Sequence, residues 1–338
     1  NKKYATTTSS GTLALLAAYF GLNFERGTTI LCPVYGYHAS SYPMVYFGLY
    51  PSFCDVESTT LNLDSRSLET RIESSTKAIT LVSMWGLPPN YESIKTVKDQ
   101  NNLLIVEDGS RALGCSQGNL SCGAIADVTC FSLNTYKILG IGEGGILVTD
   151  NEEIYDRARV LGNPALSTFN NSRYNNYKDT GLGIKHKISP LSAYLGLLAF
   201  TEIKERIMQC NENYLYFHSQ ILQFDFLKPL VLHETSKRGG WSGFSVYYDS
   251  NKMGGLNKQF FVKALREEGC NVLEEYESNL LHTNSFYQVP LIGDQKPHFK
   301  KGDFPFSERL ISDLVIFENI CGYQKSTTPF IDQYIQAI

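Results

Sequence analysis

The chain has 338 residues, 43% of them hydrophobic, so it can bury a large core and is long enough for two domains. Its formal net charge of -4 gives no electrostatic basis for binding nucleic acid or an anionic membrane, and we expect neither as a partner. No apolar run reaches the length of a bilayer, no signal peptide is visible and the eight cysteines are scattered without a CxxC pair, so we expect a cytoplasmic protein with reduced thiols, without a disulfide scaffold or a zinc site.

Hydroxyl side chains crowd the start of the first predicted helix. Residues 6–12 read TTTSSGT, and residues 13–20, rich in leucine and alanine, favour a helix. Hydroxyls and a glycine at a helix start can cradle a phosphate, because the unpaired backbone N–H groups and the helix dipole favour an anion. Ser and Thr are also ordinary N-cap residues, so this pattern alone is a weak signal.

Predicted strands then alternate with predicted helices to about residue 165. Strands are expected at 28–33, 51–56, 78–82, 103–108, 126–131 and 144–149, and helices at 65–72, 91–100 and 157–161. Such alternation implies right-handed βαβ crossovers and a mainly parallel sheet with helices on both faces. The predicted class is therefore α/β.

The strand at 103–108 ends in two carboxylates, Glu107 and Asp108. Its apolar run is typical of a strand buried on both faces, and carboxylates at the carboxyl end of such a strand face the ligand crevice of an open sheet. A pyridoxal enzyme needs one carboxylate there, to keep the pyridine nitrogen protonated, and Asp108 fits that role. Alternatively, Asp108 only caps a helix that begins near Ser110.

Lys137 lies in the connection between the last two predicted strands, between a polar-aromatic turn and a glycine-dense loop. A lysine becomes a nucleophile when desolvation or a nearby cation lowers its pKa. It can then form a Schiff base with a carbonyl, including the aldehyde of pyridoxal phosphate. From this stretch alone, a solvated surface lysine is the favoured interpretation.

The remainder of the chain has a different pattern. Residues 163–179 are polar and predict a long loop, and a helix at 190–209, continuing to 217, should link two domains. Strands at 243–248 and 271–273, a helix at 258–268 and a last helix from residue 328 predict an α+β part. We therefore expect a large α/β domain at 1–205 and a small α+β domain at 206–338. His282, Trp241 and Tyr276 are candidates for the substrate edge between them, with a structural role favoured for each.

Several motifs, taken together, point to a known family. They are SGTLAL at 10–15, PVYGY at 33–37, TKAI at 76–79, WGLP at 85–88, VED at 106–108, FS at 131–132 with Lys137, GEGG at 142–145, GGL at 254–256 and LLH at 280–282. The sequence resembles the DegT/StrS-type (DegT/DnrJ/StrS) sugar aminotransferases, fold type I pyridoxal-phosphate enzymes, over essentially the whole chain. The resemblance implies a seven-stranded-type, mainly parallel sheet flanked by helices, and a homodimer with shared active sites. Within the family, the chain most resembles the branch that acts on ketocyclitols and related sugars, through FSL at 131–133 before Lys137 and GEGG at 142–145 after it.

The resemblance also implies roles for individual residues. Lys137 and Asp108 are the expected catalytic residues, through the Schiff base and the pyridine nitrogen. Tyr37 would lie flat against the pyridine ring, whereas without the resemblance a buried aromatic residue is the simpler interpretation. The expected cofactor-binding residues are Ser10, Gly11, Thr12, Tyr37, Asp108, Arg111, Ser132, Lys137 and Lys185.

The chain departs from the family pattern at a few positions. Arg111 stands where Gln or His is common beside the cofactor phenolate, and Ser83 stands where a small polar residue or His is found before Trp85. The WGLPP stretch at 85–89 follows the end of a predicted strand and should line the mouth of the site. An arginine at position 111 would favour the ionised phenolate and lower the pKa of the Schiff-base nitrogen. Lys185 and Lys187 replace the family's Asn and Arg, which reach the partner's phosphate. Either lysine could neutralise that phosphate as a point charge, or both could be solvated on a loop.

The implied function is an aminotransferase that moves an amino group from glutamate or glutamine to a keto-sugar, often nucleotide-linked, or a ketocyclitol, in amino-sugar or secondary-metabolite biosynthesis. Three alternatives stay open. A deoxysugar dehydrase of the same family typically carries histidine in place of Lys137, a β-eliminating lyase shares the fold, and a regulatory relative would lack the chemistry. Family members have a further segment before the position of Asn1, so we expect part of the site to come from it.

Overall fold

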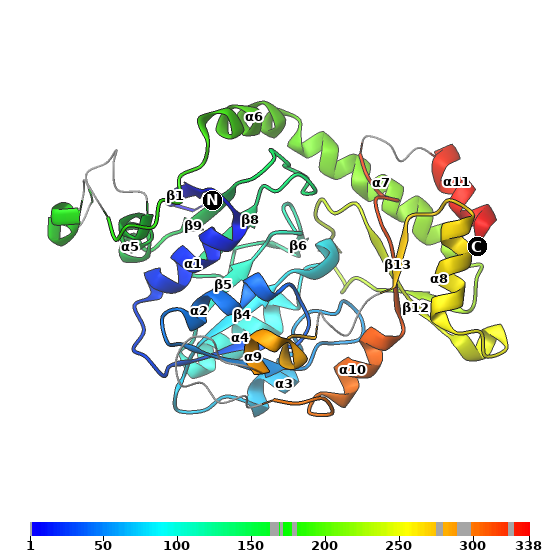
Figure 1. The fold of residues 1–338 in the computed structure, drawn as a ribbon, viewed down its shortest axis with the longest axis horizontal. Coiled ribbons are helices and arrows are strands. Elements are labelled where there is room, and N and C mark those ends of the chain that lie inside the picture. The colour runs from blue at the N-terminus through cyan, green and yellow to red at the C-terminus, as the bar shows by residue number, and fades with distance from the viewer. Residues whose placement is uncertain are drawn as a thin grey trace.

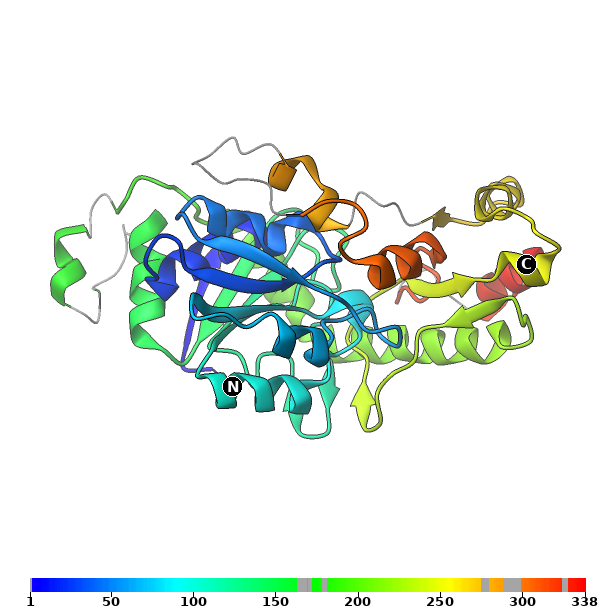
Figure 2. The same ribbon diagram turned by 90° about the horizontal axis from the view of Figure 1, so that it is seen from below.

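The computed structural model describes residues 2–162, 169, 172–177, 181–274, 280–288, 299–323 and 328–338. It contains a seven-stranded sheet flanked by helices and, at one end of the molecule, a four-stranded sheet with its own helices (Figures 1 and 2). Within the described residues, no helix is long and apolar enough to cross a membrane.

The larger sheet holds the strands of the first 150 residues. Its order is β1 (Tyr4–Thr8), β9 (Gly145–Thr149), β8 (Val128–Ser132), β5 (Leu104–Asp108), β4 (Thr76–Val82), β2 (Thr29–Pro33) and β3 (Tyr50–Cys54). The pairs from β3 to β8 are parallel, and β9 pairs antiparallel with both β8 and β1. The expected mainly parallel sheet is confirmed. Strand β1 was not expected, because its threonine run was assigned to the approach to a helix.

Two hydrophobic cores lie on opposite faces of this sheet. Val106 and Ala78 point into the core that contains α1 (Gly11–Leu22), whereas the adjacent Ile105 and Ile79 point into the core that contains α4 (Tyr91–Asn101). This alternation is the period of two that a strand imposes on its side chains. The helices α2 (Tyr42–Val45) and α5 (Glu152–Gly162) belong to the first core, and α3 (Ser65–Thr70) belongs to the second.

The four-stranded sheet is antiparallel throughout. Its order is β10 (Leu227–Pro229), β12 (Phe244–Tyr248), β14 (Leu314–Phe317) and β13 (Val272–Glu274), packed with α7 (Ile203–Ile221), α8 (Lys258–Glu267) and α11 (Thr328–Ala337). This is the α+β pattern expected for the C-terminal part. Besides α6, the other helices in the described part of the chain are α9 (Ser285–Gln288), α10 (Pro305–Ser312) and the short 3-10 turns His38–Ser40, Met84–Gly86, Ser172–Tyr177, Ser250–Met253 and Leu281–Thr283.

A small third sheet ties the two parts together. In it, β11 (Ser236–Lys237) pairs with β6 (Ser116–Gln117), which in turn pairs with β7 (Leu120–Ser121). The segment that precedes β12 is therefore held against the loop that follows β5. This pairing brings residues near 240 close to residues near 111.

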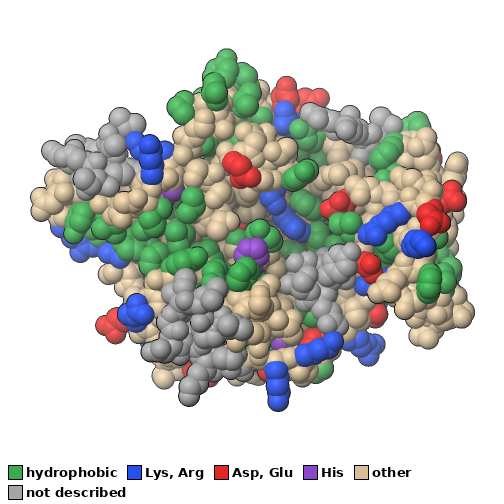
Figure 3. Space-filling view, viewed as in Figure 1, with side chains coloured by type: hydrophobic (Ala, Val, Ile, Leu, Met, Phe, Trp, Pro, Cys, Tyr) green, Lys and Arg blue, Asp and Glu red, His purple; other side chains and the backbone are tan. Residues whose placement is uncertain are grey.

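Helix α6 (Pro190–Thr201) contains no buried residue although most of its side chains are apolar. Leu191, Leu197 and Phe200 are 77%, 69% and 59% exposed. The helix stands at the top of Figure 1, and the same region of Figure 3 is covered by hydrophobic side chains. The expected continuous helix at 190–217 is wrong in one respect, because the chain leaves helical geometry at Glu202 (φ -99, ψ 1) and α7 starts after it.

Candidate active site

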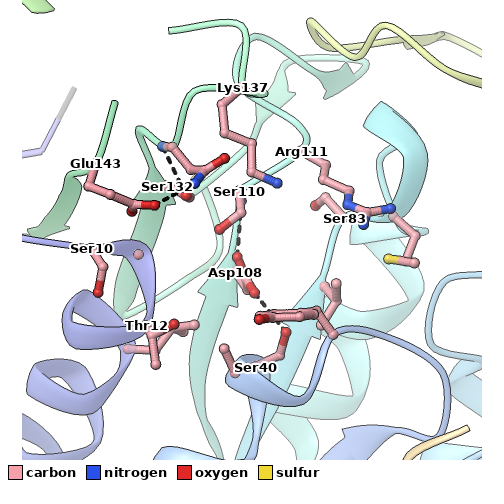
Figure 4. A pocket seen from close by; sticks show the side chains of 17 residues that line it. Ser10, Thr12, Ser40, Ser83, Asp108, Ser110, Arg111, Ser132, Lys137 and Glu143 are labelled. Carbon is pink, nitrogen blue, oxygen red and sulfur yellow. Dashed lines mark hydrogen bonds between the residues drawn. The ribbon is translucent and has the colours of Figure 1, made fainter. Parts of the chain in front are cut away.

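A cavity of about 330 Å³ opens where three parallel strands end. Val82, Asp108 and Ser132, the last residues of β4, β5 and β8, lie in its wall. Eight of the nine expected cofactor-binding residues line this cavity: Ser10, Gly11, Thr12, Tyr37, Asp108, Arg111, Ser132 and Lys137. The topology therefore gathers side chains from four separate stretches of sequence around one space (Figure 4).

Asp108 lies at the bottom of this space and is 7% exposed. One carboxylate oxygen accepts a hydrogen bond from the Ser40 hydroxyl at 2.7 Å, and the other accepts one from the Ser110 backbone N–H at 3.0 Å. No helix begins at Ser110, where the chain forms turns. The alternative in which Asp108 only caps a helix is therefore wrong, and its carboxylate is fixed facing the cavity.

Lys137 reaches the same space from the turn that follows β8 (Figure 4). Its backbone N–H donates to the Asn134 carbonyl at 2.8 Å, and Thr135 bonds across the loop to Gly142 at 2.9 Å, so the loop is closed on itself. Burial and, secondly, the Arg111 cation lower the pKa of Lys137 to about 8, against the opposing effect of the Asp108 carboxylate. A larger fraction of this amine is therefore neutral near neutral pH than for an exposed lysine.

The corner between α1 and β8 is shaped to hold an anion. Ser10 is the N-cap of α1, and its hydroxyl accepts from the Leu13 backbone N–H at 3.2 Å. The helix start is pressed against the end of β8, because a Cβ on Gly11 would lie 2.7 Å from the Cβ of Ser132. Only glycine allows this close approach. As a result, the Thr12 and Ser132 hydroxyls and the positive end of the helix dipole lie on the same side of the cavity.

Arg111 lines the cavity wall and lies against two indole rings. Its guanidinium carbon is 4.4 Å from the ring centroid of Trp85 and 4.7 Å from that of Trp241. Trp85 was expected to line the mouth of the site. It is instead 6% exposed and lies behind Arg111, outside the cavity lining.

Glu107, the neighbour of Asp108, faces away from the cavity. It is fully buried and accepts hydrogen bonds from Ser83, Tyr91 and the Gly123 backbone at 3.0, 2.5 and 2.7 Å. Burial raises the pKa of Glu107, against the opposing effect of these donors. With these contacts, Glu107 can orient the groups around it but cannot reach the cavity.

The other expected residues lie in different places. Tyr37 is 56% exposed at the edge of the cavity, so the interpretation of a buried aromatic residue is wrong. Lys185 is exposed and does not line the cavity of its own chain, and its reach toward a partner stays a prediction. His282 is fully buried and lies 2.8 Å from Glu308, which is a structural contact. Tyr276 falls outside the described residues.

Several lining residues were not expected as site residues. The polar ones among them, Ser40, Ser110, Asn134 and Glu143, all contribute to the cavity wall. Ser110 follows the Asp108 motif directly and could have been included on that ground. Nothing in the sequence around Ser40 marks it as a partner of a carboxylate 68 positions away.

The chain is similar to known proteins over most of its length. A model of the DegT/DnrJ/EryC1/StrS aminotransferase family matches residues 1–320. The chain is 26% identical over 308 residues to the spore coat polysaccharide biosynthesis protein SpsC of Bacillus subtilis, covering 90% of this chain and 77% of that protein. It is 29% identical over 210 residues to the GDP-perosamine synthase of Escherichia coli O157:H7, covering 62% of this chain and 56% of the synthase.

The fold is shared with solved structures. The E. coli GDP-4-keto-6-deoxy-D-mannose-3-dehydratase, solved with bound hydrated PLP, superposes with a TM-score of 0.84 at 22% identity, covering 99% of this chain and 87% of that one. At this level of identity the likeness shows the fold alone.

Proposed function

The chain belongs to the DegT/DnrJ/EryC1/StrS aminotransferase family, and from that premise we propose that it transfers an amino group from glutamate or glutamine to a keto-sugar or ketocyclitol. One observation carries the proposal. The Lys137 amine, its pKa lowered to about 8, faces Asp108 across a cavity that also holds an anion-binding corner. A reactive amine, a fixed carboxylate and a phosphate site are the three elements that a pyridoxal-phosphate enzyme needs.

The residues present fit pyridoxal phosphate, the cofactor of this family. Asp108 would hold the pyridine nitrogen, and the start of α1 with the Ser10, Thr12 and Ser132 hydroxyls would hold the phosphate. Tyr37, exposed at the cavity edge, is free to lie against the ring. When bound, the cofactor supplies an electron sink for the bond that breaks at the substrate's α-carbon.

In this proposal Lys137 moves the proton. Its Nζ would accept the proton from the α-carbon of the amino-acid donor and would later return a proton at the carbon that receives nitrogen. An amine of pKa about 8 suits both directions, because it exchanges protons readily near neutral pH. Asp108 keeps its position through Ser40 and Ser110 during both half-reactions.

The family relatives also suggest a second activity. One solved structure with this fold is a deoxysugar dehydratase. The dehydrase branch is expected to carry histidine where this chain has Lys137, so the lysine favours amino transfer. The name of the GDP-perosamine synthase suggests that a nucleotide-linked keto-sugar is one acceptor to test here.

We infer that the protein is a homodimer with shared active sites. The apolar surface of α6, which contains no buried residue, supports this, because exposed apolar surface of this extent on one helix usually marks an interface. Lys185 and Lys187 follow directly before that helix and would reach the partner's phosphate. We further infer a cofactor-binding part at 1–205 and a smaller part at 206–338. The eight unpaired cysteines are in keeping with a cytoplasmic protein.

A single-turnover experiment tests the proposed function. The protein loaded with pyridoxal phosphate is mixed with L-glutamate or L-glutamine labelled with ¹⁵N at the α-amino group, without acceptor. We expect one equivalent of 2-oxo acid per site and retention of ¹⁵N on the protein-bound cofactor, followed by release of the label to an added keto-sugar. Release of ammonia and pyruvate from other amino acids would indicate a lyase instead. Loss of water from a 4-keto-6-deoxysugar without label transfer would indicate a dehydratase.

A further inference from the structure

Trp241 is an aromatic residue from the C-terminal part of the chain that approaches Lys137. It lies between β11 and β12, and the Lys137 Nζ is 5.5 Å from its ring centroid. It also contacts Arg111, which lies in the cavity wall. Trp241 thus touches two of the charged residues of the site without lining the cavity itself.

Trp85 and Trp241 form an aromatic corner for the Arg111 guanidinium. Their ring centroids are 5.9 Å apart and the rings are tilted by 55°, so the guanidinium lies in the angle between two faces rather than between parallel plates. Contact with two ring faces restricts the guanidinium more than contact with a single ring does, because each ring attracts the cation along a different direction. The corner therefore fixes both the position and the direction of this charge.

The backbone around Trp241 is itself fixed to the connections that follow β4 and β5. Gly239 donates to the Gly86 carbonyl at 2.8 Å, and Gly240 donates to the Leu113 carbonyl at 3.0 Å. The approach is so close that a Cβ on Gly86 would lie 2.9 Å from the Cβ of Trp241. Gly86 and Leu113 thus position the Trp241 ring, which in turn holds Arg111.

Few charged groups act on Lys137. Among the described residues that line the cavity, the other charged ones are Asp108, Arg111 and Glu143. Glu143 accepts a hydrogen bond from the Asn134 side chain at 2.6 Å. Arg111 is the one cation of the three, and it opposes a positive charge on Lys137. Its position relative to the amine therefore matters for the proton affinity of that amine.

We propose that Trp241 is a positioning residue of the active site: together with Trp85 it fixes the Arg111 guanidinium beside Lys137, so that the segment before β12 controls the charge environment of the reactive amine. The inference rests on the proposed function in taking Lys137 as the reactive group. It predicts that the effect of Trp241 on Lys137 passes through Arg111.

The test measures the titration of Lys137 in the protein without cofactor. Trace labelling with an acylating reagent over a pH series, followed by peptide mass spectrometry, gives the pKa of this lysine directly. In the wild type we expect a Lys137 pKa of about 8. In Trp241→Leu this pKa should rise by on the order of one unit, because the Arg111 guanidinium is no longer held and moves toward solvent. Trp241→Phe keeps a ring face and should stay close to wild type.

A double-mutant cycle separates positioning from simple burial. In an Arg111→Met background, Trp241→Leu should shift the Lys137 pKa much less than it does in the wild type. An equal shift in both backgrounds would show that Trp241 acts on Lys137 by itself, and no shift in either would remove it from the site; both results overturn the proposal. Arg157→Met serves as the control, because Arg157 also lies against a ring, that of Phe20 at 4.5 Å, but does not line the cavity.

A second variant keeps the test decisive if Trp241→Leu does not fold. Arg111→Lys retains a cation but loses the planar group that the two rings hold. The Lys137 labelling curve should then move to higher pH, and a curve that coincides with wild type would refute the role of the aromatic corner. Since labelling needs no cofactor, the result stands apart from the ¹⁵N-transfer experiment, which alone decides the proposed function.

Discussion

Replacing Gly11 by alanine adds a single methyl group, which should collide with Ser132 and so weaken cofactor binding. The new Cβ would lie 2.7 Å from the Ser132 Cβ, 3.0 Å from its Cα and 3.1 Å from its Oγ. Two of these atoms lie on or next to the backbone of β8, so the start of α1 must move away from the strand end. That movement separates the Thr12 and Ser132 hydroxyls, which line the anion-binding corner together.

The magnitude follows from overpacking. Forcing a methyl group into a well-packed contact costs about 1 to 3 kcal/mol, and the higher helix propensity of alanine returns at most about 1 kcal/mol. If the strain is relieved by opening the corner, the affinity for pyridoxal phosphate should fall by about tenfold, equivalent to roughly 1.4 kcal/mol. Fluorescence titration of the cofactor and urea unfolding of the cofactor-free protein measure the two effects separately.

Gly21→Ala is a matched control on the same helix. A Cβ there would lie 2.9 Å from the Ile154 side chain and 3.0 Å from its carbonyl, at the far end of α1. It should therefore lower the free energy of unfolding by a similar amount but leave cofactor affinity unchanged. Equal losses of affinity in the two variants, or unchanged affinity in Gly11→Ala, would refute the assignment of this corner to the phosphate.

Three further predictions concern the charge and the interface. Ser40→Ala removes the 2.7 Å hydrogen bond to Asp108 and should slow the donor half-reaction by about tenfold, whereas Ser110→Ala keeps its backbone donor and should not; equal rates would count against Asp108 as the orienting carboxylate. Covalent capture of pyridoxal phosphate requires neutral Lys137, so its rate should rise with pH and level off above about 8; in Arg111→Gln the plateau should move to higher pH, since removal of the cation raises the pKa of Lys137, and stopped-flow curves that coincide would reject this cause. Leu197→Glu places a charge on the apolar face of α6 and should convert the dimer to a monomer in light scattering, whereas Leu222→Glu, on a residue 60% exposed beyond the end of α7, should not.

Local patterns predicted most of the sheet and the two central residues. The sequence predicts the strand that ends in Asp108 and the glycine-rich loop next to Lys137, because a buried strand and a turn each require particular residue types within a few neighbouring positions. Strand β1 was missed for the same reason. Its threonines suit both a strand and a helix approach, and the antiparallel pairing with β9 that decides between them joins residues 137 to 145 positions apart.

Contacts between distant side chains were not predictable in this way. The Ser40 to Asp108 hydrogen bond and the contact of Trp241 with Arg111 depend on how the sheets are placed, which no single stretch encodes. Trp85 was expected at the mouth of the site because it follows a strand end. Its backbone instead takes a left-handed conformation (φ 55) in the turn after β4, and its ring packs behind Arg111.

The most direct test of the account is to find where the cofactor attaches. The protein is incubated with pyridoxal phosphate, reduced with borohydride and digested, and the modified peptide is identified by mass spectrometry, with and without prior addition of L-glutamate. The account predicts one modified residue, Lys137, and loss of that modification after glutamate has been added. Attachment elsewhere, or a modification at Lys137 that no amino-acid donor removes, would contradict the proposal that this lysine carries the amino transfer.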